Sequence, residues 1–399
     1  MENISNPFSK SQLMPQEEKL EIRKKRGQLF IGIPKEDFRT EKRICLTPES
    51  VNMLIKAGHK VLFEAGAGLE ASYEDLKYSE AGAVITHDRT KIFACPIVLK
   101  VSPPTLEEIR LMKPKTYLFS ALQLKTQKKE YFEALSKKKI TALSYEFIKD
   151  RYGAYPFLQA ISEMAGIASI QIASEYMCRM SGGKGLLFGN ITGVPPTEIV
   201  ILGAGLVGLA AARTALSLGA NVKVFDNNIH KLKRLQNELP CRVFTSTLQE
   251  RVLAKALMRC DVAIGATKGD NRSPILVSEE MVQNMKPGSV IIDVSIDNGG
   301  CFETSEVTTH EKPITTKFGV IHYGVPNITS KFSKTATLAI SNIISPYLLE
   351  ISEKGTIEDA VSYDPTIRSG IYMYQGILTN ESIAKWFNLN YKDLNLIFL

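Results

Sequence analysis

A glycine-rich turn between two short apolar strands constrains the fold of this 399-residue chain more than any other feature. It stands in EIVILGAGLVGLAAARTALSLGANVKVFD, residues 198–226, where a strand, a turn, a helix and a second strand follow one another. Gly203 allows the tight turn, Gly205 lets the backbone approach a pyrophosphate, and Gly208 lets the helix pack closely on the strand. This order is typical of a dinucleotide-binding βαβ unit.

The residues around this turn predict how a dinucleotide is held. Leu206 and Val207 open the helix, where free N–H groups and the positive end of the helix dipole face the phosphates. Asp226 ends the second strand, where a carboxylate accepts hydrogen bonds from ribose hydroxyls and repels a 2′-phosphate. NAD is therefore favoured over NADP, although Lys231 and Arg234 lie close enough in the sequence to leave NADP open.

Strands alternate with helical patterns on both sides of this motif, over residues 29–145 and again over residues 197–326. Such alternation implies parallel strands with helical crossovers. The chain is also too long for one compact core. We therefore expect an α/β protein of two domains, with a hinge in the glycine-rich stretch 181–196.

Composition is that of a soluble protein, with 44% hydrophobic and 23% charged residues. No apolar run approaches the roughly 18 residues of a membrane-spanning helix, and the first thirty residues lack a secretory apolar core. We expect a cytoplasmic location and no membrane partner. The six cysteines are scattered without a CxxC pair, which predicts reduced, mostly apolar positions and neither disulfides nor a metal site.

The net charge of +7 invites comparison with nucleic-acid-binding proteins. Much of the excess is local, in the run of basic residues at 19–26 and in the three lysines at 137–139. Runs of this kind are usually solvated faces, and no nucleic-acid-binding motif accompanies them. We therefore expect no nucleic-acid partner.

Several residues follow predicted strands directly. In open parallel sheets, ligands bind outside the carboxyl ends of the strands. Thr267 ends the strand at 260–267, and Ile296 and Asp297 end the one at 289–297, which places them on the nicotinamide side. Asn327 ends the next segment.

Two basic residues of the N-terminal half are candidates for substrate binding. Lys100 follows the apolar run Ile97–Leu99, and burial there is expected to lower its pKa and suit it to acid–base or carbonyl chemistry. Arg43, in RTEKRICLTPESV, could bind a carboxylate through a two-pronged guanidinium pair. The residues alone favour a surface arginine in a charge-rich loop.

Taken together, these residues resemble the alanine dehydrogenase family, which is related to the NAD-binding subunit of proton-translocating transhydrogenase. The resemblance runs from about Phe30 to Leu389 and is carried by GIPKE, RICLTPESV, AGHKVLFEAGAG, VLKV, SEMAG, GVPP, GAGLVG, MKPGSVIIDVSIDNGGCFETS, TTH, VPN and TATLAISN. It implies two Rossmann-like domains with a cleft between them. An N-terminal arm (1–28) would precede a substrate domain (29–156 plus 334–399) that surrounds an NAD domain (157–333).

The resemblance also implies roles for particular residues. Arg43 would hold the substrate carboxylate, Lys100 would hold the carboxylate or carbonyl oxygen, and Asp297 would assist proton transfer. The dinucleotide contacts would come from Ser162, Asp226, Lys231, Thr267, Ile296, Asp297 and Asn327, with Asn327 also near the substrate. Members of the family are commonly hexamers, so we expect a homo-oligomer, with a hexamer favoured and a dimer possible.

Two departures bear on the chemistry. The segment 116–124 is predicted as a buried strand, and Gln123 near its end replaces the catalytic histidine of the family. A histidine with a pKa near 6.5 can carry a proton, whereas a glutamine only positions substrate through hydrogen bonds. Glu306 stands where the family usually carries an arginine beside the cofactor.

Three functions stay open on this evidence. The leading one is an NAD-dependent dehydrogenase of a small L-amino acid, most simply L-alanine, in which Lys100 and Asp297 carry the proton traffic. The second is a transhydrogenase-like protein or another 2-oxoacid–amine reductase. The third is a non-catalytic NAD-binding regulatory paralogue, which the changes at Gln123 and Glu306 motivate.

Overall fold

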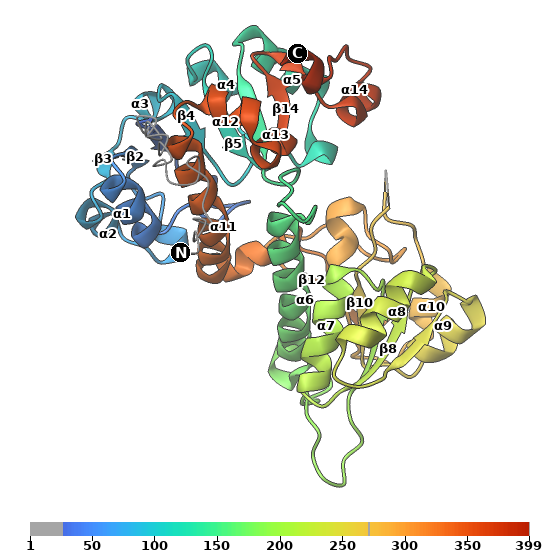
Figure 1. Ribbon diagram of the computed structural model, residues 1–399. Coiled ribbons are helices and arrows are strands. Elements are labelled where there is room, and N and C mark those ends of the chain that lie inside the picture. Colours follow the sequence, from blue (N-terminus) through green and yellow to red (C-terminus); the bar gives the residue numbers. More distant parts are fainter. Residues whose placement is uncertain (1–26, 270–271, 399) are drawn as a thin grey trace, which may run out of the picture.

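The computed structural model describes residues 27–269 and 272–398, which form two bodies, each built around one sheet (Figure 1). Most of the N-terminal arm predicted at 1–28 lies outside the described residues. The α/β class and the two Rossmann-like sheets are confirmed. The domain boundaries and the cleft between the domains stay predictions.

The first sheet has eight strands in the order β15-β14-β6-β5-β4-β1-β2-β3. Its strands are β1 (Phe30–Ile33), β2 (Lys60–Glu64), β3 (Val84–Thr86), β4 (Ile97–Leu99), β5 (Tyr117–Ser120), β6 (Thr141–Ser144), β14 (Ile371–Tyr374) and β15 (Ile377–Leu378). The helices of this body are α1 (Pro48–Lys56), α2 (Asp75–Glu80), α3 (Arg89–Phe93), α4 (Leu106–Leu111), α5 (Lys129–Lys137), α12 (Ile357–Tyr363), α13 (Pro365–Gly370) and α14 (Glu381–Phe387). Both ends of the chain therefore contribute to it.

The second sheet has seven strands in the order β12-β13-β11-β10-β7-β8-β9. Its strands are β7 (Glu198–Leu202), β8 (Asn221–Phe225), β9 (Phe244–Ser246), β10 (Val262–Gly265), β11 (Val290–Asp293), β12 (Ile314–Lys317) and β13 (Val320–Tyr323). The helices beside it are α7 (Leu206–Ser217), α8 (Ile229–Glu238), α9 (Glu250–Leu257) and α10 (Glu279–Gln283).

Each sheet has one topological switch point. Along the chain, β1 pairs in parallel with both β2 and β4, and β7 pairs in parallel with both β8 and β10. The strand order therefore reverses between β1 and β4 in one sheet and between β7 and β10 in the other. Loops diverge at such a point and leave room for a ligand at the carboxyl ends of the strands. The two switch points are thus the places to look for a site.

Two long helices connect the bodies. The helix α6 (Pro156–Met177) contributes Phe157 to the core of the eight-stranded sheet and the residues from Ala165 onward to the core of the seven-stranded sheet. The helix α11 (Ser333–Glu353) contacts α6 and returns the chain to the first core (Figure 1). None of the helices in the described part of the chain combines the length and apolar character that a bilayer span requires.

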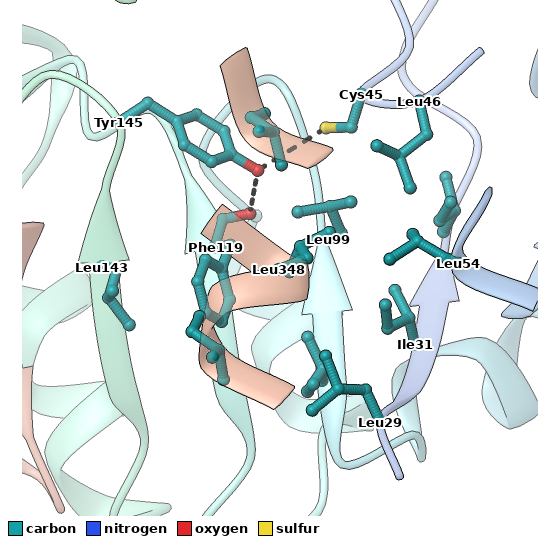
Figure 2. Packing of buried hydrophobic residues seen from close by; sticks show 14 of the residues in the cluster. Leu29, Ile31, Cys45, Leu46, Leu54, Leu99, Phe119, Leu143, Tyr145 and Leu348 are labelled. Atoms are coloured by element: carbon teal, nitrogen blue, oxygen red, sulfur yellow. Dashed lines mark hydrogen bonds between the residues drawn. The ribbon is translucent and has the colours of Figure 1, made fainter. Parts of the chain in front are cut away.

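In the core of the eight-stranded sheet, Cys45 and Tyr145 pack next to β5. Cys45 lies 3.7 Å from the hydroxyl of Tyr145, which donates a hydrogen bond to the carbonyl of Phe119 at 3.0 Å (Figure 2). Burial raises the pKa of the Cys45 thiol well above its usual value, so this cysteine remains an inert small hydrophobe. All six cysteines are free, as predicted, although Cys178 and Cys241 are exposed.

The predicted strand at 116–124 is shorter in the structure. β5 ends at Ser120, and the chain then turns so that Gln123 adopts a left-handed conformation with φ of 48°. The apolar residues Ala121 and Leu122 are buried, but they lie in the turn and outside the sheet. Apolar content alone cannot distinguish a strand from a buried turn.

Candidate active site

The switch point of the eight-stranded sheet holds a buried ion-pair network. Lys100, the residue after β4, is 3% exposed. Its Nζ lies 2.9 Å from Glu36 Oε2 and 3.2 Å from Glu108 Oε1. Glu36, which follows β1, also accepts hydrogen bonds from the backbone N–H of Val101 at 2.7 Å and from the hydroxyl of Ser102. The ammonium group of Lys100 is therefore fixed from two sides.

This network reverses the pKa expected for Lys100. Burial alone lowers the pKa of the ammonium, as predicted, but the adjacent carboxylates of Glu36 and Glu108 more than offset that effect, and the pKa is raised. The prediction of a lowered pKa was wrong because the sequence does not show which acids fold onto the lysine. The two carboxylates therefore favour the charged form of Lys100, which is a cation and hydrogen-bond donor at neutral pH.

Arg43 is buried rather than exposed on a loop. Its Nε and Nη2 donate to the two carboxylate oxygens of Glu41 at 2.7 and 2.6 Å. Its Nη1 donates to the hydroxyl of Thr329 at 3.0 Å, and Thr329 is distant from Arg43 in the sequence. Arg43 therefore lies where the segment after β1 meets η6 (Ile328–Phe332), which follows the seven-stranded sheet.

Gln123 is held through its backbone. The Oε2 atom of Glu146 accepts hydrogen bonds from the N–H groups of Leu122 and Gln123, both at 3.1 Å. The side chain is half-buried and follows β5. β5 lies next to β4, the strand that carries Lys100. The turn thus presents residue 123 on the same sheet edge as Lys100, whichever side chain it carries.

The switch point of the seven-stranded sheet carries the glycine turn. Gly203 has φ of +109°, and a Cβ there would lie 2.4 Å from the carbonyl oxygen of Ala266. A Cβ on Gly208 would lie 1.9 Å from the carbonyl oxygen of Gly203, whereas one on Gly205 would meet nothing within 4 Å. Gly205 is the N-cap of α7. Space is therefore open at the helix N-terminus, and the residues fit a dinucleotide pyrophosphate there.

Asp226 lies at the end of β8, beside that turn. Its Oδ2 accepts from the N–H of Ala204 and its Oδ1 from the N–H of Asn228, both at 2.8 Å. A carboxylate oxygen accepts more than one hydrogen bond, so both oxygens retain capacity for ribose hydroxyls. Lys231 is exposed on α8, and its N–H is bound to Asn228 Oδ1 at 3.1 Å. The Nη2 of Arg234 lies 3.5 Å from the carbonyl of Ala204.

The remaining predicted residues lie after β10, β11 and β13, except Ser162, which lies on α6. The Thr267 N–H donates to Ser295 Oγ at 2.9 Å, and Ile296 is buried. Asp297 Oδ1 accepts from the N–H of Asn327 at 2.8 Å. Ser162 is half-buried on α6, and its contact with a dinucleotide stays a prediction.

Asp297 is exposed to solvent, and the folded protein still removes part of the water around its carboxyl group. Loss of hydration raises the pKa of its carboxyl above the ordinary value, while the hydrogen bond from Asn327 and the charge of Arg43 act in the opposite direction. A carboxyl group of raised pKa is suited to exchange protons.

Glu306, the second departure from the family pattern, pairs with a lysine of the same body. It is exposed and forms an ion pair with Lys317 at 2.7 Å. That hydrogen bond and the charge of Lys317 lower the pKa of the Glu306 carboxyl. Glu306 is thus an ionised surface carboxylate in this structure.

Sequence reasoning missed four carboxylates of the site, namely Glu36, Glu41, Glu108 and Glu146. One of them has a local signal: Thr105 and Glu108 form a capping box at the start of α4, a pattern that is readable as Thr-x-x-Glu. Glu36 and Glu146 bind residues that are distant in sequence, and Glu41 lies two positions from its partner Arg43 in a charge-rich loop that gives no sign of burial. Their roles could not be read from spacing.

The fold and the site together define a class: two-domain α/β proteins with a glycine turn at the switch point of one sheet and a buried lysine at the switch point of the other. The model of the alanine dehydrogenase/PNT N-terminal domain matches residues 32–168, and that of the C-terminal domain matches residues 169–381. The chain belongs to the alanine dehydrogenase/PNT family.

Curated relatives and solved structures agree with this assignment. Alanine dehydrogenase of Methanococcus maripaludis is 40% identical over 366 residues, which are 91% of this chain and 98% of that protein. Alanine dehydrogenase of Staphylococcus epidermidis is 37% identical over the same shares. A solved L-alanine dehydrogenase has a TM-score of 0.83 at 36% identity and covers 90% of this chain and 99% of its own. A transhydrogenase from Sinorhizobium meliloti, at 24% identity and a TM-score of 0.74, shares the fold.

Proposed function

We propose that this chain catalyses the NAD-dependent oxidative deamination of a small L-amino acid, with L-alanine, pyruvate and ammonium as the leading reactants. One observation carries the proposal. The basic switch point with Lys100 and Arg43 and the glycine turn with Asp226 occupy equivalent edges of two sheets. Arg43 joins one body to the other through its hydrogen bond to Thr329. A substrate and a dinucleotide bound at these edges would meet between them.

NAD, when bound, would accept or donate the hydride. Gly205 and the N-terminus of α7 would hold its pyrophosphate, because that position alone in the turn has open space for it. Asp226 would accept the ribose hydroxyls and repel a 2′-phosphate. Lys231, Thr267, Ile296, Asn327 and Ser162 would complete the contacts.

Lys100 and Arg43 would bind the substrate. The protonated Lys100 would donate a hydrogen bond to the carbonyl oxygen of the 2-oxoacid and stabilise negative charge that develops there. Arg43 would bind the carboxylate. Gln123 would orient the substrate by a hydrogen bond, since an amide exchanges no proton at neutral pH.

Asp297 would handle the proton. Its raised pKa brings its titration closer to neutrality than that of an ordinary aspartate. In deamination its carboxylate would accept a proton, and in the reverse direction its carboxyl would donate one. Lys100 would not share this task, because its carboxylate partners favour its protonated form.

A substrate screen tests the proposal. Purified protein is mixed with NAD and each of a panel of L-amino acids at alkaline pH, or with NADH, ammonium and each of a panel of 2-oxoacids, and absorbance of NADH is followed. We expect turnover with L-alanine and pyruvate, and a weaker signal when NADPH replaces NADH. No turnover with any pair would contradict the proposal.

A second function, a non-catalytic NAD-binding regulator, is favoured by one observation, the glutamine at position 123 on an otherwise intact sheet edge. It predicts tight NADH binding, measured by fluorescence, without turnover in the screen. Turnover with any substrate excludes it.

The glycine turn gives a prediction with a built-in control. Gly208→Ala is expected to destabilise the protein by about 1–3 kcal/mol because its Cβ collides with the backbone at Gly203. Gly205→Ala meets open space in the protein and should leave the thermal unfolding midpoint unchanged, yet weaken NADH binding about tenfold, or about 1.4 kcal/mol. Calorimetry and fluorescence titration measure the two effects. Equal unfolding midpoints for the two variants would contradict the prediction.

Asp297 gives a prediction for pH dependence. Since its pKa is raised in the folded protein, kcat/KM for L-alanine oxidation should fall as the pH drops through that value, where the carboxylate is lost. Asp297→Asn should lack this acidic limb, and its rate should be about a hundredfold lower than that of the wild type. The surface variant Glu80→Gln should keep the acidic limb and the wild-type rate.

The same shift has a consequence for stability. A raised carboxyl pKa stabilises the folded state at low pH, and this contribution disappears as the pH rises through the folded pKa. Asp297→Asn should therefore show a smaller loss of stability with rising pH than the wild type, as measured by urea midpoints. A steeper loss in the variant would be the opposite of the expected sign.

We also propose a homo-oligomer, with a hexamer ahead of a dimer. The segment after α6, which projects from the lower body in Figure 1, exposes the apolar residues Met180, Leu187, Ile191 and Val194. Apolar residues gathered on one segment are typical of a contact surface. Light scattering coupled to size-exclusion chromatography measures the state, and a monomer would contradict the proposal.

A further inference from the structure

Glu41 is a buried carboxylate with every acceptor position in use. Its side chain is 2% exposed. Oε1 accepts from the Nε and the backbone N–H of Arg43 at 2.7 and 3.0 Å. Oε2 accepts from Arg43 Nη2 at 2.6 Å and from Asn327 Nδ2 at 3.1 Å. A carboxylate offers about four acceptor sites, so Glu41 has none left for a substrate or a proton. Any role it has must act through Arg43 and Asn327.

These contacts extend from one body to the other. Asn327 follows β13 of the seven-stranded sheet, and its backbone N–H donates to Asp297 Oδ1 at 2.8 Å. Its side chain also donates to the carbonyl of Thr40 at 3.2 Å. An unbroken series of hydrogen bonds thus runs from Arg43 through Glu41 and Asn327 to Asp297. Asn327 has φ of 53°, a conformation that asparagine adopts more readily than most residues.

Glu41 also decides which edge of Arg43 is available. An arginine has five N–H groups. Glu41 takes the Nε–H and one N–H of Nη2, and Thr329 takes one N–H of Nη1. Among the hydrogen bonds of the described residues, one N–H on each terminal nitrogen remains. These two N–H groups are available to a carboxylate, which an arginine can bind through two parallel hydrogen bonds.

We propose that Glu41 is a positioning residue that keeps the terminal edge of Arg43 available for the substrate carboxylate and, through Asn327, links that orientation to the Asp297 side of the site. This inference rests on the proposed function, because it takes a 2-oxoacid as the ligand of Arg43. A glutamine at position 41 offers one acceptor oxygen and places N–H groups against Arg43 Nη2 or Asn327 Nδ2. Arg43 would then rotate, and the link to Asn327 would break.

The experiment compares Glu41→Gln, Glu41→Asp, Asn327→Gly and the double variant Glu41→Gln/Asn327→Gly in reductive amination of pyruvate with NADH. Glycine keeps the left-handed backbone at position 327 without the side chain. Glu198→Gln removes a different ion pair, to Lys223 at 2.6 Å, and Asn388→Gly removes another left-handed asparagine, with φ of 50°. Both are matched controls away from Arg43.

We expect Glu41→Gln to raise KM for pyruvate about tenfold while kcat changes less than threefold, with partial recovery in Glu41→Asp, which keeps the charge. The double variant should be no worse than the more affected single variant, because both changes break one series of hydrogen bonds. A pyruvate KM within twofold of wild type for Glu41→Gln, or effects that multiply in the double variant, would overturn the proposal. If Glu41→Gln fails to fold, Glu41→Asp carries the test, with a KM rise of at least threefold expected and an unchanged KM overturning it.

A second readout separates this proposal from the proposed function. If the wild type turns over no 2-oxoacid, the proposed function fails, and the link between Glu41 and Asn327 is then measured by NADH fluorescence titration alone. Glu41→Gln should weaken NADH binding at least threefold in the wild-type background and leave it unchanged in the Asn327→Gly background. Equal weakening in both backgrounds, or none in either, would overturn the link.

Discussion

Lys100→Met is expected to lower kcat about 100- to 1,000-fold and to leave NADH binding within about twofold, because removing one donor that stabilises developing negative charge costs that much in comparable sites. Methionine preserves most of the length and the apolar contacts of the lysine stem while removing the ammonium. Lys100 is 3% exposed and is held by Glu36 and Glu108, so the variant leaves these two buried carboxylates without their shared cation. Steady-state kinetics with pyruvate and fluorescence titration with NADH measure the two effects.

The matched control is Lys223→Met, which removes another paired lysine on β8, away from the first sheet. It should keep at least half of the wild-type kcat. The raised pKa of Lys100 adds a check with a definite sign. Lys100 should remain protonated up to its ordinary pKa of about 10.4, so its deprotonation should cause no loss of activity below that pH. Lys100→Arg should therefore leave the shape of the pH profile unchanged. A Lys100→Met variant with more than a tenth of the wild-type kcat would contradict the assigned role.

Gln123→His is expected to raise kcat/KM about 100-fold near neutral pH and to introduce a new limb in the pH profile near 6.5, because a histidine there can act as a general acid and base. The structure favours a clean substitution. The backbone N–H groups of residues 122 and 123 both donate to the carboxylate of Glu146, so the turn does not depend on the side chain at position 123. Histidine is also among the residues that tolerate a left-handed backbone such as the φ of 48° at this position.

The control for this variant is Gln127→His, which adds a histidine four residues further on, where the glutamine amide binds the carbonyl of Leu122 at 3.1 Å. It should change neither kcat/KM nor the shape of the pH profile. If Gln123→His leaves the rate unchanged while NADH still binds, position 123 does not deliver a side chain to the reacting atoms.

Much of the fold could be predicted from local patterns. The strand Glu198–Leu202 opens the predicted βαβ unit, and α1 starts at Pro48 with Thr47 as its N-cap, a pattern that is readable in the sequence. These features depend on near neighbours, such as the hydrogen bond from the Ser50 N–H to the Thr47 hydroxyl. Helix caps and glycine turns are satisfied within a few residues, so they are readable in sequence.

The candidate site could be predicted only in part. Lys100, Asp226 and Asp297 were found because each follows a strand, and parallel strands bring their carboxyl ends to one edge. Arg43 was expected at the surface because its partners, Glu41 nearby and Thr329 far along the chain, were not recognised as a buried set. The environment of Lys100 was also predicted incorrectly, since Glu36 and Glu108 approach it only after β1, β4 and α4 have packed.

The sequence by itself determined the α/β class, the glycine turn, the acid at Asp226 and the replacement of a histidine by Gln123. All four depend on residue identity and short spacing. Only the tertiary structure decided that Lys100 stays charged, that Glu41 saturates one edge of Arg43, and that Asn327 links Glu41 to Asp297. Ionisation and hydrogen-bond orientation depend on which charges become neighbours when water is excluded, and folding alone brings residues 41 and 327 together.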